Sequence, residues 1–183
     1  MKSKFFTQVF VASESVFFAA LLVSYAYLGL YKTHGPASVQ SLNAFKTGLY
    51  SIALFSSSFT MWMARRNFIK KNYNAVKAWL LGTIILGSTF IFGEGSEYIE
   101  LYKDQVTMSR DTFGSAFFTI TGFHGMHVTL GLLVLCITLG LITFGDIEKF
   151  GISTMESVEV YWHFVDGVWV FVFTVIYLIP HII

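Results

Sequence analysis

Seven ionisable side chains lie inside long apolar stretches of this chain, where a charged group needs a partner or a chemical purpose. An ionised side chain at the centre of a bilayer costs about 2.5–3.5 kcal/mol on insertion scales. Groups placed there either pair inside the protein or take part in proton, ion, metal or lipid binding. The seven candidates are Glu14, Glu97, His124, His127, Glu156, His163 and Asp166.

Glu14 lies about ten residues into its apolar stretch, or roughly 15 Å at 1.5 Å per helical residue. Ser13 and Ser15 flank it and can donate hydrogen bonds to its carboxyl group. Two roles remain open for Glu14: a structural carboxyl bonded to a neighbouring helix, or a proton- or lipid-linked group.

The segment "GEGSEYIE" carries Glu94, Glu97 and Glu100 with a spacing of three residues. We expect Glu100 to be solvated at the membrane interface and Glu97 to be a buried, hydrogen-bonded carboxylate. The glycines Gly93 and Gly95 predict close approach of another backbone at this point.

Four ionisable residues near the C-terminus form one stripe on a predicted helix, with spacings of three, seven and ten residues from the first. Such a stripe faces protein rather than lipid. The pair at its deeper end can form a charge-assisted hydrogen bond. The stripe consists of Glu156, Glu159, His163 and Asp166.

"TGFHGMHV" places His124 and His127 three residues apart on one helix, and such a pair can bind one metal ion. However, di-iron carboxylate bundles require a Glu-x-x-His motif on paired helices, and neither histidine belongs to one. The alternative is a pair of buried, hydrogen-bonding histidines, with Gly122 and Gly125 permitting close packing. Spacing favours the second interpretation and leaves the first open.

The composition indicates that lipid surrounds most of the chain. Of its 183 residues, 55% are hydrophobic and 13% are charged, about half the charged fraction of a soluble domain. A bilayer crossing takes about 20 apolar residues. The sequence therefore predicts an all-α bundle of five transmembrane helices in one domain, residues 1–183, with spans at about 5–31, 42–65, 74–102, 112–144 and 153–182.

Lys and Arg are divided unequally between the two predicted membrane sides, and the richer side faces the cytoplasm. Eight fall on the side of the N-terminus and four on the other, so the N-terminus is predicted inside and the C-terminus outside. The first group is Lys2, Lys4, Arg65, Arg66, Lys70, Lys71, Lys77 and Lys149, and the second is Lys32, Lys46, Lys103 and Arg110. The net charge of +1 gives no indication of nucleic-acid binding, and the single Cys136 excludes an intrachain disulfide.

Four stretches resemble subunit III of haem-copper terminal oxidases of the cytochrome c oxidase type. "FFTITGFHGMHVTLG" and "YWHFVDGVWVF" are similar to signature segments of that family, "SESVFF" to the start of its third helix and "GSEYIE" to the end of its fifth. All four occur in family order, so the resemblance extends over nearly the whole chain.

The resemblance implies a non-catalytic subunit that packs on subunit I, holds structural phospholipid and supports proton uptake and durability during oxygen reduction. Haem and copper are then expected in partner subunits and none in this chain. Glu14 matches a carbodiimide-reactive carboxylate of the family, and the other six candidates match polar motif positions. Subunit II and other subunits are expected partners, and membership of a respiratory supercomplex stays open. The expected location is a bacterial inner membrane.

The longer family form has seven helices, so a two-helix arm is expected to be absent or supplied by another chain. The family also has a basic residue late in the penultimate helix, and between Arg110 and Lys149 this sequence has none. Other functions remain open: the equivalent subunit of a quinol oxidase or nitric oxide reductase, a small proton-coupled transporter, or a haem-binding membrane enzyme.

Overall fold

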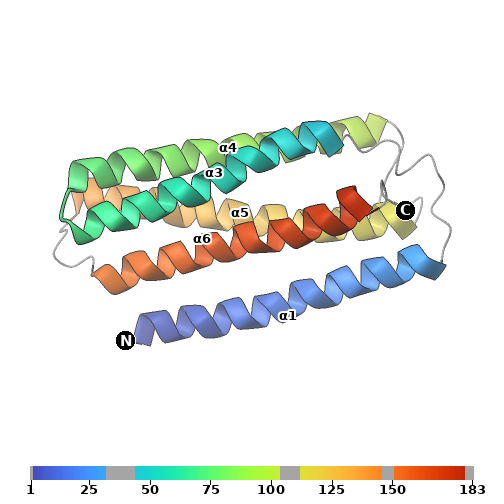
Figure 1. The fold of residues 1–183 in the computed structure, drawn as a ribbon, viewed down its shortest axis with the longest axis horizontal. Coiled ribbons are helices and arrows are strands. Elements are labelled where there is room, and N and C mark those ends of the chain that lie inside the picture. The colour runs from blue at the N-terminus through green and yellow to red at the C-terminus, as the bar shows by residue number, and fades with distance from the viewer. Residues whose placement is uncertain (1, 32–43, 104–111, 146–150, 180–183) are drawn as a thin grey trace.

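A computed structural model describes residues 2–31, 44–103, 112–145 and 151–179, and within these ranges the chain forms helices and no strand. The predicted all-α class and its five long helices are confirmed. The helices lie along a common long axis (Figure 1). They are α1 (Lys2–Tyr31), α3 (Ala44–Ile69), α4 (Tyr73–Lys103), α5 (Thr112–Phe144) and α6 (Ile152–Phe173), which continues into the π-helical segment η1 (Thr174–Leu178).

The start of α1 and the end of η1 lie at opposite ends of the bundle (Figure 1). A tight turn joins α3 to α4, and Lys71 adopts a left-handed backbone conformation there, with φ of 57°. The backbone N–H of Lys71 donates to the Phe68 carbonyl over 3.0 Å, and that of Asn72 donates to the Asn67 carbonyl over 3.0 Å. These bonds satisfy carbonyls that the end of a helix leaves without partners. The turn therefore packs α3 and α4 as an antiparallel hairpin.

Four of the five helices are long and apolar enough to cross a membrane: α1, α4, α5 and α6 with η1. The exception is α3, whose buried face contains Thr47, Ser51 and Ser57 beside apolar residues. Small polar residues let neighbouring helices approach closely. The crossing of the membrane by α3, the single transmembrane domain and the orientation of the termini stay predictions.

One predicted boundary differs from the observed helix. The second span was expected to end at Arg65, whereas α3 continues for four more residues to Ile69. The last span was expected to run to Ile182, and in the structure α6 continues beyond Phe173 as the π-helical segment, which ends at Leu178. The predicted limits at 42 and 182 lie outside the described residues, as do three of the counted cations, Lys32, Arg110 and Lys149.

Trp162 on α6 connects three other helices at the centre of the bundle. Its indole is fully buried, and its Nε1 donates a 2.9 Å hydrogen bond to Ser57 Oγ of α3. The ring lies against the backbone of Gly87 on α4 and of Gly131 on α5. A Cβ atom added at either glycine would come within 2.9 Å of the ring.

Trp169 repeats this arrangement two turns further along α6. Its Nε1 donates to Ser51 Oγ of α3 over 2.8 Å. The indole packs edge-on against Phe90 of α4, with centroids 4.7 Å apart, and stacks on the ring of His124 of α5 at 4.8 Å. The two tryptophans make α6 the common neighbour of α3, α4 and α5. Helix α1 packs on α5 and α6 from the opposite side (Figure 1).

Candidate functional site

The polar stripe predicted on α6 faces α3, and its first two members bind one arginine. Arg65 Nη2 lies 3.1 Å from Glu156 Oε1, and its Nε lies 3.1 Å from Glu159 Oε2. Arg65 and Glu156 are partly buried, and Glu159 is buried. One guanidinium therefore forms ion pairs with two carboxylates and joins the end of α3 to the start of α6.

The deeper members of the stripe, His163 and Asp166, meet at Ser58 of α3. The Ser58 hydroxyl lies 2.9 Å from His163 Nδ1 and also hydrogen-bonds Asp166 Oδ2. The sequence predicted a pairing of His163 with Asp166, and the structure links the two side chains through a serine. His163 Nε2 lies 3.9 Å from Glu159 Oε1, beyond hydrogen-bond distance.

Glu14 of α1 pairs with His127 of α5, at a distance of 3.2 Å between Glu14 Oε2 and His127 Nε2. His127 Nδ1 lies 2.7 Å from the Phe123 carbonyl oxygen, so this nitrogen must carry a proton. Two arrangements are compatible with the contact between Nε2 and Glu14. Either a neutral ring accepts a hydrogen bond from a protonated Glu14, or a charged ring donates a hydrogen bond to the Glu14 carboxylate. In both, a single proton is shared between the carboxyl group and Nε2.

The serines that flank Glu14 could have donated hydrogen bonds to its carboxyl group, but they donate to the backbone instead. Ser13 Oγ donates to the Phe10 carbonyl and Ser15 Oγ to the Val11 carbonyl, each over 2.7 Å. Serine hydroxyls commonly bond a carbonyl of the preceding helical turn in this way. The partner of Glu14 is therefore supplied from α5.

His124 and His127 lie in different environments although they are one helical turn apart. His124 is fully buried, and neither of its ring nitrogens has a hydrogen-bond partner among the described residues. Its ring is held by stacking on Trp169 and by an edge contact with Phe90 at 5.8 Å. The expectation that both histidines bond within the protein therefore holds for His127 and is wrong for His124.

A third polar group lies near the start of α3 and the end of α4 and includes Glu97. The Glu97 carboxylate accepts hydrogen bonds from Thr47 Oγ1 at 2.9 Å and from Tyr177 Oη at 2.7 Å. Nearer to these helix ends, Lys46 pairs with the exposed Glu100. Glu97 thus ties α3, α4 and the π-helical segment together.

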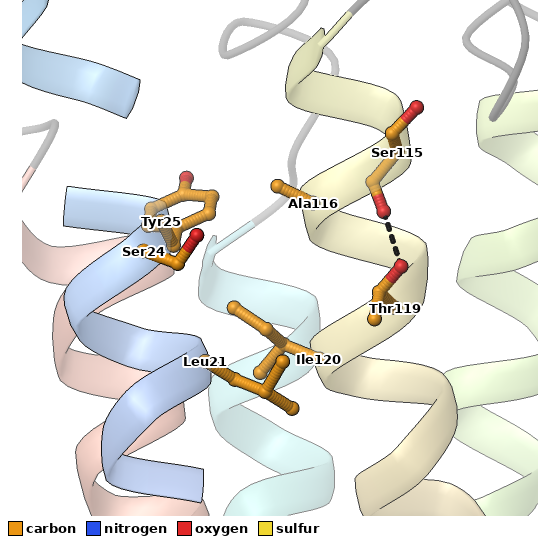
Figure 2. Close-up of a pocket in the computed structure, with 7 residues that line it drawn as sticks. All are labelled: Leu21, Ser24, Tyr25, Ser115, Ala116, Thr119 and Ile120. Atoms are coloured by element: carbon orange, nitrogen blue, oxygen red, sulfur yellow. Dashed lines mark hydrogen bonds between the residues drawn. The ribbon is translucent and has the colours of Figure 1, made fainter. Parts of the chain in front are cut away.

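A groove of about 220 Å³ opens between α1 and α5 near the same end (Figure 2). Leu21 and Tyr25 line it from α1, and Ala116 and Ile120 from α5. The hydroxyl of Thr119 on the α5 wall donates to its own helix, at the Ser115 carbonyl. The walls of the groove are thus mainly apolar.

Comparison with known families gives a match to the model for Cytochrome c oxidase subunit III over residues 3–180. The chain belongs to the cytochrome c oxidase subunit III family. The resemblance predicted from the four sequence motifs is confirmed.

Relatives at about one-third identity cover nearly all of this subunit III chain. A Mycobacterium leprae protein named Probable cytochrome c oxidase subunit 3 is 34% identical over 175 residues, which is 94% of this chain and 86% of the relative. The Synechocystis Cytochrome c oxidase subunit 3 is 34% identical, covering 93% and 73%. A Pseudomonas aeruginosa protein named Cytochrome bo(3) ubiquinol oxidase subunit 3 is 32% identical, covering 93% and 81%.

As in the family to which it belongs, this chain is a multi-pass membrane protein and a non-catalytic oxidase subunit. Within the part of the chain that the structure describes, no three His, Cys, Asp or Glu side chains are grouped to hold a metal ion. The polar side chains instead form separate pairs and triads, each joining two or three helices. Their contacts join the helices of the bundle to one another.

The sequence reasoning missed the serines of α3 that this subunit III uses as partners. Two of these serines, Ser51 and Ser57, accept hydrogen bonds from tryptophans of α6, and the third, Ser58, hydrogen-bonds His163 of α6. Ser51 and Ser58 are seven residues apart and therefore lie on one helix face, which is the signal that was available.

Proposed function

We propose that this chain is the integral subunit III of a cytochrome c oxidase complex, and that it packs directly on the haem-copper subunit I. The observation that carries the proposal is the family match over nearly the whole chain. The arrangement of the polar groups supports it, because they bond helix to helix and do not converge on one reaction centre. Haem and copper are assigned to partner subunits, including subunit I, with subunit II and further chains completing the complex.

Purification in a mild detergent at native expression tests this proposal. We expect the chain to be recovered with a haem-copper subunit, identified by mass spectrometry of the complex. Reproducible recovery of the chain alone would overturn the proposal. A flux assay of the lone chain in liposomes is the matched control for the transporter alternative, and we expect no proton-coupled flux.

We assign cytochrome c as the electron donor of the complex, because the first relatives are named as subunits of a cytochrome c oxidase. The Pseudomonas relative favours a second candidate, a ubiquinol oxidase, at almost the same identity. The purified complex should oxidise reduced cytochrome c faster than ubiquinol. The opposite preference would assign the chain to a quinol oxidase without changing its family.

We infer that α3 also crosses the membrane, which places the α3–α4 turn in the cytoplasm and the end of α4 outside. The location proposed is the bacterial inner membrane. Single cysteines at Lys70 and Lys103, in a background with Cys136 replaced by serine, test this orientation. An impermeant maleimide added to intact spheroplasts should label position 103 and spare position 70.

We assign Glu14 and His127 a proton- or lipid-linked role that supports proton uptake and durability of the oxidase. Their shared proton gives this pair the means to exchange one, and the groove in Figure 2 offers apolar walls to a phospholipid chain. With Glu14→Ala, we expect assembly to survive while sustained turnover or lipid retention falls. Wild-type lipid content together with an unchanged activity time course would refute the role.

A further inference from the structure

The side chain of His163 is half exposed at a depth where the surroundings are hydrocarbon. His163 follows the start of α6 by eleven residues, or roughly 16 Å at 1.5 Å per residue, and the hydrocarbon core is about 30 Å thick. Its side chain is nevertheless 40% exposed on the outside of the bundle. An acyl chain cannot satisfy an imidazole nitrogen, so lipid is an unfavourable neighbour for this ring.

One ring nitrogen of His163 has no hydrogen-bond partner within hydrogen-bond distance among the described residues. His163 Nδ1 is engaged by Ser58, which also bonds Asp166, so that side of the ring is fixed. The contact recorded for Nε2 is with Glu159 Oε1 at 3.9 Å, which is too far for a hydrogen bond. The ring is thus oriented by the bundle, and its second nitrogen can still accept or donate one hydrogen bond.

The surface beside His163 is shaped for close approach of another helix. A groove of about 340 Å³ runs between α1 and α6, and small residues line part of it: Ser15, Ala19 and Gly167. Gly167 follows His163 by four residues, and Val170 follows it by seven, so all three lie on one face of α6. Figure 1 shows this helix in front of α5, with α3 and α1 on its two sides. Small residues at such a surface are typical of interfaces between transmembrane helices.

The outer surfaces of α4 and α5 carry exposed apolar side chains, among them Ile85, Phe92, Leu130, Leu133 and Ile137. Such a surface is suited to acyl chains and needs no protein cover. The α6 surface also exposes apolar side chains, Val170 and Phe171, and it differs in carrying the partly exposed imidazole of His163 among them.

We propose that the surface of α6 formed by His163, Gly167 and Val170, with its α1 and α3 flanks, is the docking surface for a transmembrane helix of the catalytic subunit. We call it the His163 face. That helix presents a hydrogen-bonding side chain to His163 Nε2 at the middle of the membrane, and it packs into the groove beside Gly167. The inference rests on the proposed function, and it adds which face of this chain binds the partner and through which contact.

Photo-crosslinking in the intact complex tests the assignment. Benzoylphenylalanine is placed at Val170, which is 47% exposed on the His163 face, and at the control position Phe92, which is 79% exposed on α4. The two positions lie at similar depth, 18 and 19 residues from the same end of their helices. Peptide mass spectrometry should identify the haem-copper subunit crosslinked to position 170 and not to position 92. A position 170 that crosslinks only lipid or a different subunit overturns the docking assignment, while recovery of the intact complex still supports the proposed function.

Substitutions at His163 test the predicted contact itself. His163→Leu removes the hydrogen-bonding group and should raise dissociation of this chain during a detergent titration by about 3- to 20-fold, the range for a hydrogen bond between membrane helices. His163→Gln keeps a hydrogen-bonding group and should stay within about twofold of the wild type. Ser58→Ala removes the two bonds inside the bundle, to His163 and to Asp166, and leaves His163 Nε2 in place, so it should raise dissociation less than His163→Leu does. An effect as large as that of His163→Leu would show that the loss comes from disruption of the bundle and would overturn the contact. Equal dissociation of the leucine, glutamine and wild-type proteins overturns the contact.

Discussion

Replacing Gly131 with alanine should destabilise the bundle through a collision with Trp162. The new Cβ would lie 2.9 Å from Trp162 Cζ3 and 3.2 Å from Tyr161 Cε1. Carbon atoms pack best at about 3.5–4.0 Å, so at least one ring must move. Overpacking of this kind costs about 1–3 kcal/mol, and alanine returns up to about 1 kcal/mol of helix propensity. With the full 1 kcal/mol returned, we expect a net loss of about 0–2 kcal/mol in the free energy of unfolding, which is about 1–3 kcal/mol worse than alanine at an unobstructed glycine of the same helix.

The assay is unfolding of the purified chain in mixed micelles by increasing SDS mole fraction, followed by far-UV circular dichroism. Gly140→Ala is the matched control on the same helix, because no atom lies within 4 Å of its added Cβ. It should be neutral or stabilising by up to about 1 kcal/mol.

A double-mutant cycle then attributes the loss to Trp162. Trp162→Phe removes the larger ring system, so the cost of Gly131→Ala should fall in that background by at least about 0.5 kcal/mol. Equal stabilities of the Gly131→Ala and Gly140→Ala proteins, or additivity within about 0.3 kcal/mol in the cycle, would refute the reasoning.

Two further substitutions test the hydrogen bonds that cross the bundle. Ser57→Ala leaves Trp162 Nε1 without its acceptor and should lower the free energy of unfolding in the SDS titration by about 0.6–1.7 kcal/mol. The control is Ser56→Ala, which removes an exposed hydroxyl that bonds its own helix and should change stability little. Equal effects of the two substitutions would contradict the assignment. Glu97→Gln weakens the acceptor for Tyr177 Oη, so amide hydrogen exchange in the π-helical segment should accelerate. Unchanged exchange rates in that segment would show that Glu97 does not stabilise it.

The helices could be predicted from the sequence because a membrane crossing requires about 20 apolar residues in a row. The α6 stripe was predictable for a related reason, since ionisable groups at fixed helical spacing must face protein. By contrast, α3 contains six serine and threonine residues among its 26, and its polarity keeps it below the threshold that the other four helices pass.

The partners inside the site were less predictable, because a side chain does not disclose its neighbour across a helix interface. Gly93 was expected to admit another backbone, and Gly125 was expected to permit close packing. The structure instead places the ring of Tyr50 on Gly93 and the carboxyl group of Glu94 on Gly125. A glycine in the sequence thus predicts that another group packs closely against it, but it does not predict which group that is.

The pairing of Glu14 with His127 also sets a schedule for biosynthesis. The two residues are 113 positions apart, and α1 packs only on α5 and α6 among its larger contacts. At about 5–20 residues per second, ribosomes need about 6–23 s to make the intervening chain. During that interval Glu14 has been synthesised and His127 has not, so the carboxyl group has yet to meet its partner. If α1 enters the membrane during synthesis, its apolar residues must outweigh the cost of inserting an unpaired carboxyl group until α5 follows.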